Sequence, residues 1–340
     1  MANSKKINLG LCILKAWMAM EVLLVHRCDF SDYPNAVFHF LKVVGPRSVP
    51  IFCIIAFYFS EGFIIKGNVE KLKSRILRLW IPLVGWAIIC WLGYVVIEVV
   101  CMHYLHLTLF DLFMAIVFGC RNGVNQTMWF QLVMIILTAF YFYLFKLLGE
   151  KKGMIATYIT FAIAIILQAT GWNYDHLCNL TFELNNTVGN IFQMMPYACL
   201  GLWFKHFNIF ERFKDKRVII CVIFTVLLFV GIAIPYPAFK GFFEGFDPMH
   251  MSICLFIIFL FLPLDDVSDR TRNIIMKATR YTLGVYAAHR LVYSYLDIIY
   301  DLLNISFGSF TKCIITYLVC YLVSWIIDRI PNKYIKGLVD

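Results

Sequence analysis

Residues 79–101 read LWIPLVGWAIICWLGYVVIEVVC, and a run this long and this apolar indicates a helix that crosses a membrane. A crossing helix needs roughly 20 mostly apolar residues to span ~30 Å of hydrocarbon. The rest of the chain has the same character, because 61% of its 340 residues are hydrophobic and only 15% are charged. Such a chain cannot bury its apolar surface in a water-soluble core, so lipid is its main solvent.

Similar apolar runs recur from one end of the chain to the other. They predict an all-α, polytopic membrane protein with about ten transmembrane helices, formed as a single domain over residues 1–340 without a soluble domain. The predicted spans are residues 9–26, 48–65, 79–101, 128–148, 153–170, 188–205, 217–235, 250–264, 281–300 and 311–328. Residues 105–120 are apolar but short for a crossing, which favours an interfacial or re-entrant helix.

The Lys and Arg residues are distributed unevenly between the connections. Most of the 30 lie at the N-terminus, in residues 66–78, 146–152, 205–217 and 270–280, and at the C-terminus. The alternate connections hold only Arg27, Lys42, Arg47, Arg121, Lys240 and Lys312. By the positive-inside rule, this alternation predicts an even number of spans with both termini in the cytoplasm. Because the basic residues do not form one basic face, the net charge of +9 does not indicate nucleic-acid binding.

Ionisable side chains inside a span are costly, so each is a candidate functional residue. The first span carries Lys15, Glu21 and His26. The spacing of Lys15 and His26 returns to nearly the same helix face, about 16 Å further along the axis. An extended ligand such as coenzyme A could reach both, with its phosphates near the cation and its thioester near an imidazole that acts as a general base. Alternatively, Lys15 snorkels to the interface, His26 faces water and Glu21 is an ion-pair partner.

Two arginines precede the third span. Arg75 and Arg78 lie one helical turn apart and point the same way. Two guanidinium groups on one face at the inner interface suit bidentate binding of phosphate. The alternative is that this basic segment faces anionic lipid.

Further candidates lie in later spans. His289 and Arg290 fall near the middle of the ninth span, where a charge lines a substrate pathway or pairs with Glu21 or Glu61. Trp129, at the outer end of the fourth span, serves either in an interfacial aromatic belt or in stacking on a sugar. The sequence shows no metal-binding cluster and no Gly-rich phosphate loop.

Five short motifs, taken together, resemble the acyltransferase-3 family of membrane acyltransferases. Their order and spacing fit that family from the first span to about residue 295. The motifs are Lys15-x10-His26, the run Arg47-Ser-Val-Pro-Ile-Phe52, Arg75-x-x-Arg78-x3-Pro82, Trp129-Phe130-x-Leu132 and Gly284-Val-Tyr-x-x-His289.

The resemblance implies transfer of an acyl group, usually acetyl, from cytoplasmic acyl-coenzyme A to a hydroxyl of a cell-surface or lipid-linked glycan. Acetyl-coenzyme A would be the donor, the glycan or lipid-linked sugar and membrane lipid would be the other partners, and no metal or nucleic acid is expected. The location would be the cell membrane, which in a bacterial cell is the inner, cytoplasmic membrane. The predicted site comprises the catalytic residues His26 and Glu21, the donor-binding residues Lys15, Arg75 and Arg78, and the substrate-binding residues Arg47, Trp129, His289 and Arg290.

Two positions depart from the family pattern. Lys15 stands where the family has arginine, which keeps the charge but loses the planar fork for phosphate. After the second-span run the family has Ser-Gly, whereas this chain has Ala56-Phe57 and, later, Ser60-Glu61-Gly62. Two other functions remain open, a flippase or exporter for lipid-linked sugars, since in-span charges also mark transport pathways, and an inactive relative that acts as a biosynthetic scaffold.

Overall fold

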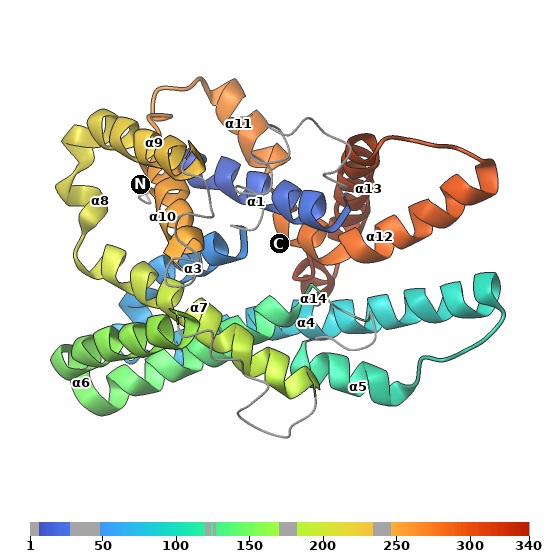
Figure 1. Ribbon diagram of the computed structural model, residues 1–340, viewed down its shortest axis with the longest axis horizontal. Coiled ribbons are helices and arrows are strands. Elements are labelled where there is room, and N and C mark those ends of the chain that lie inside the picture. Colours follow the sequence, from blue (N-terminus) through green and yellow to red (C-terminus); the bar gives the residue numbers. More distant parts are fainter. Residues whose placement is uncertain are drawn as a thin grey trace.

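The computed structural model describes residues 7–27, 48–119, 124, 127–169, 182–233 and 246–339, and in these residues the fold is all-helical, as predicted (Figure 1). The elements are α1 (Leu9–Arg27), α3 (Ser48–Ile65), α4 (Val69–Ile97), the π-helical turn η3 (Glu98–Met102), α5 (Leu109–Phe118), α6 (Trp129–Ala169), α7 (Phe182–His206), α8 (Ile209–Arg212), the 3₁₀ turn η5 (Lys214–Lys216), α9 (Arg217–Ala233), α10 (Phe246–Phe261), α11 (Asp269–Ala278), α12 (Thr282–Leu303), α13 (Ser309–Arg329) and α14 (Lys333–Lys336).

Six helices in the described residues are long and apolar enough to cross a membrane. They are Leu9–Arg27, Ser48–Ile65, Val69–Met102, Trp129–Gln168, Lys214–Ala233 and Ser309–Arg329. The remaining predicted spans also fall on helices, α7, α10 and α12, but the count of ten crossings stays a prediction. Residues 109–118 of the predicted interfacial segment form the short apolar helix α5.

Helix α6 is two helices joined at Gly149. The backbone of Gly149 is non-helical, with φ 73° and ψ 172°, in the left-handed region that favours glycine. The two halves pack against each other, since the Tyr141 hydroxyl lies 3.3 Å from Thr160 Oγ1. This break lies between the predicted spans 128–148 and 153–170, so one long apolar stretch supplies two helical segments.

Helices α1 and α3 lie at the centre of the bundle, and α9 lies at its periphery (Figure 1). Within the apolar windows of α1 and α3, 56% of the residues are buried, against none in α9. Helix α3 packs against α7, α6 and α10, while α1 packs against α12, α13 and α10. Gly201 of α7 permits the close approach to α3, because a Cβ there would lie 2.5 Å from the Ile54 carbonyl oxygen. The spans that carry the in-membrane polar residues are therefore mostly enclosed by other helices.

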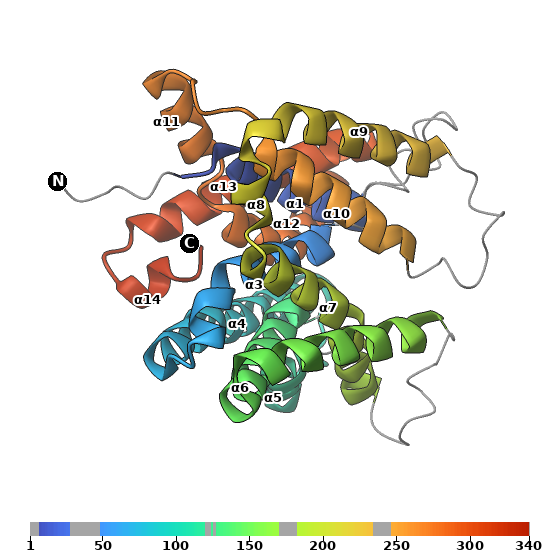
Figure 2. The same ribbon diagram turned by 90° about the vertical axis from the view of Figure 1, so that its left-hand side faces the viewer.

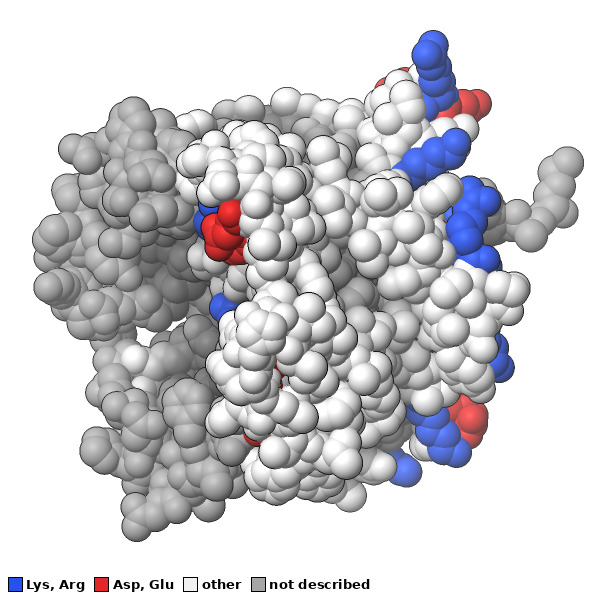
Figure 3. All heavy atoms as spheres, turned by 90° about the vertical axis from the view of Figure 1, so that its right-hand side faces the viewer, with Lys and Arg blue, Asp and Glu red and all other residues white. Residues whose placement is uncertain are grey.

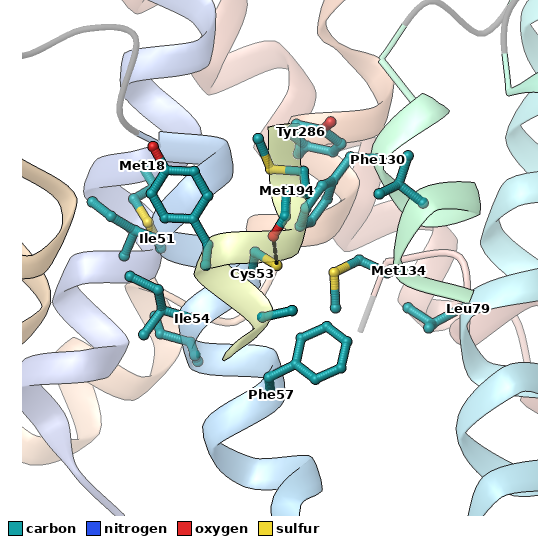
Figure 4. Close-up of a cluster of buried hydrophobic side chains, with 14 of the residues drawn as sticks. Met18, Ile51, Cys53, Ile54, Phe57, Leu79, Phe130, Met134, Met194 and Tyr286 are labelled. Atoms are coloured by element: carbon teal, nitrogen blue, oxygen red, sulfur yellow. Dashed lines mark hydrogen bonds between the residues drawn. The ribbon is translucent and has the colours of Figure 1, made fainter. Parts of the chain in front are cut away.

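Side chains from helices far apart in the chain form one buried cluster around α3, part of which Figure 4 shows. Met18 of α1, Phe57 of α3 and Met194 of α7 belong to it, and the Cys53 thiol donates to the Met194 carbonyl oxygen at 3.5 Å. Between helices in lipid, association depends on close van der Waals packing, because lipid tails are as apolar as the side chains. This packing fixes α3 as a wall of the cavity described below.

Lys and Arg side chains gather along one edge of the described structure. Figure 3 shows them along this edge, beside a broad uncharged surface. In the opposite view the same edge carries α11 and α14 (Figure 2). This differs from the expectation that the basic residues form no single basic face, but it fits the positive-inside rule, which predicts that basic connections lie on one side of a membrane. The cytoplasmic location of the termini stays a prediction.

Candidate active site

A cavity of about 810 Å³ lies between α1, α3, α4, α6 and the beginning of α12. Along α3 it is lined from Phe52 to Phe63, a distance of about 17 Å at 1.5 Å per residue. Its lining contains six cations and, among the described residues, no carboxylate. The six are Lys15, Lys66, Lys71, Arg75, Arg78 and Arg280. The cavity is therefore suited to an elongated, negatively charged ligand.

The local sequence explains how α4 presents its two arginines. Asn68 caps the helix, with its side-chain oxygen accepting from the Lys71 backbone N–H at 3.0 Å. The helix then continues without interruption, so Arg75 and Arg78 reach the cavity one turn apart. The Nε atom of Arg75 is buried and has no hydrogen-bond partner among the described residues. Both arginines line the same cavity, which confirms the prediction that they point the same way. The buried N–H group at Arg75 Nε is available to hydrogen-bond a ligand.

A further arginine reaches this end of the cavity from the last third of the chain. The guanidinium of Arg280 donates to Asp328 Oδ1 at 3.2 Å and lies 3.0 Å from Oδ2. Asp328 is only 8% exposed, and its Oδ2 also accepts from the Tyr281 hydroxyl at 3.0 Å. Asp328 therefore holds Arg280 at the cavity. The sequence did not single out Arg280 as a site residue, although Arg280 lies in a basic connection immediately before a predicted span.

The opposite end of the cavity is aromatic. The Phe52 ring lies 6.3 Å from the Phe130 ring and 6.1 Å from the Tyr286 ring, between centroids. The Tyr286 hydroxyl donates to the Thr127 carbonyl oxygen, which fixes the ring. Gln131 lines the same end and is 6% exposed. Figure 4 shows Phe130 and Tyr286 close together above the buried cluster.

Two histidines stack just beyond this aromatic end. The His289 ring lies 6.3 Å from the Tyr286 ring, and the His26 ring stacks on His289 at 5.4 Å with an interplanar angle of 21°. His289 is fully buried, whereas His26 is exposed. Lys15 lines the cavity and His26 does not. The expectation that Lys15 and His26 both line one cavity is therefore corrected. Tyr286 and His289 lie between the cavity and His26.

Hydrogen bonds fix both imidazole rings. Arg290 Nη2 lies 3.2 Å from His26 Nδ1, and His289 Nδ1 lies 2.6 Å from the Tyr286 carbonyl oxygen. The neighbouring Arg27 joins the ends of α1 and α12 through a two-point contact with Asp297, at 2.6 and 2.5 Å. This ion pair keeps the two histidine-bearing helices in register.

The family model described as an acyltransferase domain, acyltransferase-3, matches residues 8–329. The chain belongs to the acyltransferase-3 family. No curated protein and no solved structure matches it. Membership makes this protein a membrane acyltransferase, in agreement with its apolar helices.

In this acyltransferase-3 protein, several of the positions that depart from the family pattern line the cavity. Ala56, Ser60 and Gly62 all line the cavity. A Cβ placed on Gly62 would meet nothing within 4 Å, so the wall is open there. Lys15 also reaches the cavity and makes no ion pair among the described residues. The charge at position 15 is therefore available to a ligand, although the fork of an arginine is absent.

Other predicted site residues lie away from the cavity. Glu21 is 1% exposed and accepts from Trp17 Nε1, in the same helix. Trp129 does not line the cavity but packs edge-on against Phe130, at 6.0 Å between ring centroids. Arg47 lies outside the described residues. In two of the predicted motifs a neighbouring residue lines the cavity instead, namely Phe130 in place of Trp129 and Tyr286 in place of His289.

The suggested pairing of Arg290 with Glu61 is wrong. Glu61 lies 3.4 Å from His206 Nδ1, while Arg290 contacts His26 on the neighbouring helix. The alternative reading, that Arg290 belongs to a substrate pathway, agrees better with its position beside the two histidines. Sequence spacing could not distinguish these partners, because both are separated from Arg290 by most of the chain.

Proposed function

We propose that this protein is an O-acyltransferase that moves an acetyl group from cytoplasmic acetyl-coenzyme A to a hydroxyl of a cell-surface or lipid-linked glycan. The observation that carries the proposal is the cavity itself. Among the described residues it is lined by six cations and no carboxylate, and at its aromatic end Tyr286 lies beside His289, which stacks on His26. Few ligands other than an acylated nucleotide thioester combine several phosphates with a long thin arm and a reactive end.

The basic end would bind the phosphates of the donor. Arg75 and Arg78 present planar guanidinium groups that can each bind a phosphate through two hydrogen bonds. Arg280 approaches from the turn before α12, and Lys15 from α1. Because the cations come from separate segments of the chain, donor binding would also tie these segments together at the cytoplasmic side.

The stretch of the cavity along α3 would hold the pantetheine arm. The small residues Ala56, Ser60 and Gly62 belong to its wall there, and they leave space between the larger apolar side chains of the same helix. The thioester would then lie among Phe52, Phe130 and Tyr286, a region where buried rings exclude water. Exclusion of water limits hydrolysis of the thioester before the acceptor arrives.

The acceptor would approach from the side of His26, which is exposed. The histidine pair would deprotonate the acceptor hydroxyl or carry the acyl group briefly, since imidazole serves as a base or as a nucleophile in acyl transfer. The charge of Arg27 is compensated by Asp297, whereas Arg290, which contacts His26, gives this region a positive charge. That charge suits an acidic sugar or a phosphate of a lipid-linked precursor.

The experiment uses membranes from cells that produce the protein, incubated with radiolabelled acetyl-coenzyme A. Alkali-labile label in the glycan fraction would support O-acetyl transfer, since esters but not amides are released by mild alkali. Binding of coenzyme A to the purified protein is measured in parallel. The proposal would be contradicted if the protein neither bound coenzyme A nor labelled glycan, but moved lipid-linked sugars across the membrane of vesicles. Such a protein would be a flippase.

A further inference from the structure

We infer that His289 is the general base of the transfer and that His26 is held as a hydrogen-bond donor, an inference that rests on the proposed function. Three observations carry it. The Nδ1 atoms of both rings already have partners, the Nε2 atom of His289 is buried without one, and His289 stands between the cavity and His26.

The partner of His289 decides which nitrogen carries its proton. A carbonyl oxygen can only accept, so His289 Nδ1 must donate to the Tyr286 carbonyl at 2.6 Å. A neutral imidazole has one N–H and one lone pair, and the lone pair of His289 is therefore on Nε2. This tautomer is the one in which a histidine accepts a proton at the edge facing away from its backbone.

The partner of His26 gives the opposite result. Arginine can only donate, so Arg290 Nη2 donates to the His26 Nδ1 lone pair at 3.2 Å. A neutral His26 then carries its proton on Nε2 and has no unoccupied lone pair. In this arrangement His26 cannot take a proton from the acceptor, but its Nε2–H can stabilise a negatively charged oxygen.

The environment of His289 supports this assignment. Its side chain is fully buried, and its Nε2 has no hydrogen-bond partner among the described residues. A buried acceptor without a partner is unfavourable, and a hydroxyl donor would satisfy it. Tyr286, one helical turn earlier, lines the aromatic end of the cavity. An acceptor hydroxyl that reaches His289 Nε2 from beside Tyr286 would meet there the thioester of a donor held at the aromatic end.

The reaction then proceeds as follows. His289 Nε2 takes the proton of the acceptor hydroxyl while the oxygen forms a bond to the thioester carbonyl carbon. His26 Nε2–H donates to the carbonyl oxygen as negative charge develops on it. The carbon–sulfur bond breaks, and the sulfur of coenzyme A takes the proton from His289 Nε2. The products are the ester and coenzyme A with its free thiol, and both histidines return to their starting tautomers.

The first test replaces His289 by asparagine. The Asn amide N–H lies where Nδ1 was, so it keeps the bond to the Tyr286 carbonyl, but it has no group in the place of Nε2. We expect labelling of glycan from acetyl-coenzyme A to fall by at least about 100-fold, the usual lower range for a general base, with unchanged coenzyme A binding. Added imidazole should partly restore labelling by a His289→Ala variant. The matched control is His250→Gln in α10, which keeps its bond to the Leu227 carbonyl oxygen and should label like wild type.

The second test compares two variants of His26. Glutamine carries an amide N–H near the position of Nε2, whereas asparagine does not reach it, so we expect His26→Gln to retain clearly more labelling than His26→Asn. Equal losses in the two variants, or wild-type labelling by folded His289→Asn, would overturn the inference while leaving the acyltransferase proposal intact. No labelling by the wild-type protein with acetyl-, succinyl- or butyryl-coenzyme A would instead overturn the proposed function, and the inference with it.

Discussion

The two ends of the cavity differ in burial and charge. At the basic end, Arg78 is exposed and the Arg280 side chain is 50% exposed, so water and salt reach the groups that we propose bind the donor. At the aromatic end, Tyr286 is 4% exposed and His289 is fully buried. Charges near water steer and bind but are screened, whereas polar groups in a dry site act strongly on reacting atoms. Under the proposed function, we therefore expect the basic end to determine donor affinity and the aromatic end to determine turnover.

The largest expected effect is at the aromatic end. Replacing His26 by alanine removes the imidazole next to His289, and we expect labelling from acetyl-coenzyme A to fall by about 10²- to 10⁴-fold, the range for loss of acid–base or oxyanion-stabilising groups. Coenzyme A affinity should not change, because His26 does not line the cavity. Comparable loss of affinity and turnover would show that the two ends are not separate in function.

The next effect is at the basic end. Arg75→Ala should weaken coenzyme A binding by about 10- to 100-fold, since hydrogen bonds between charged groups contribute ~1.5–3 kcal/mol. Turnover at saturating donor should remain near wild type. Lys73 is the control, because it lies on the same helix, pairs with Glu70 at 3.2 Å and does not line the cavity. If Lys73→Ala weakens binding as much as Arg75→Ala, the effect comes from general surface charge.

A smaller effect is expected at Asp328, which does not line the cavity but contacts Arg280, which does. Asp328→Asn keeps the size of the side chain but removes the charge that holds Arg280, so the Michaelis constant for acetyl-coenzyme A should rise by about 3- to 10-fold at unchanged turnover. Asp265→Asn, which disrupts an exposed pair with Arg217 at 2.8 Å, should not change it. A fall in turnover without a change in the Michaelis constant would indicate that Asp328 affects the reaction itself and not the binding of the donor at the basic end.

The smallest effect is expected outside both ends. Val222 of α9 is 57% exposed, and in a membrane such an apolar residue faces lipid. Val222→Ala should change neither donor affinity nor turnover, and thermal stability in a bilayer should change by less than about 0.5 kcal/mol. A strong loss of activity would indicate that α9 contacts the acceptor or another subunit.

Periodicity and hydropathy predicted the helical class and most helix positions, because apolar length is what a membrane requires of a chain. The break at Gly149 was implied by the basic connection around it. The sequence also identified Arg75, Arg78 and Lys15 as cavity residues, because in-span and interfacial charges stand out against an apolar background.

The rest of the site depends on contacts between helices that are far apart in the chain. Arg280 meets Asp328 across 48 positions, and His26 meets Arg290 across 264, so spacing carries no signal for either pair. The choice between Trp129 and Phe130 as the cavity residue was also missed, because it depends on how α6 rotates against α3. A rotation of about 100°, the angle between successive residues of an α-helix, decides which of two adjacent aromatic residues faces the cavity.

The most direct test of the account is the site at which the donor's thiol end lies. Coenzyme A carrying a photoreactive group on its sulfur is bound to the purified protein and irradiated, and the labelled peptides are identified by mass spectrometry. The account predicts labelling of peptides that contain Phe52, Phe130 or Tyr286, and excess coenzyme A should abolish it. Labelling confined to α9 or α13, or labelling that excess coenzyme A does not reduce, would contradict a donor bound in this cavity.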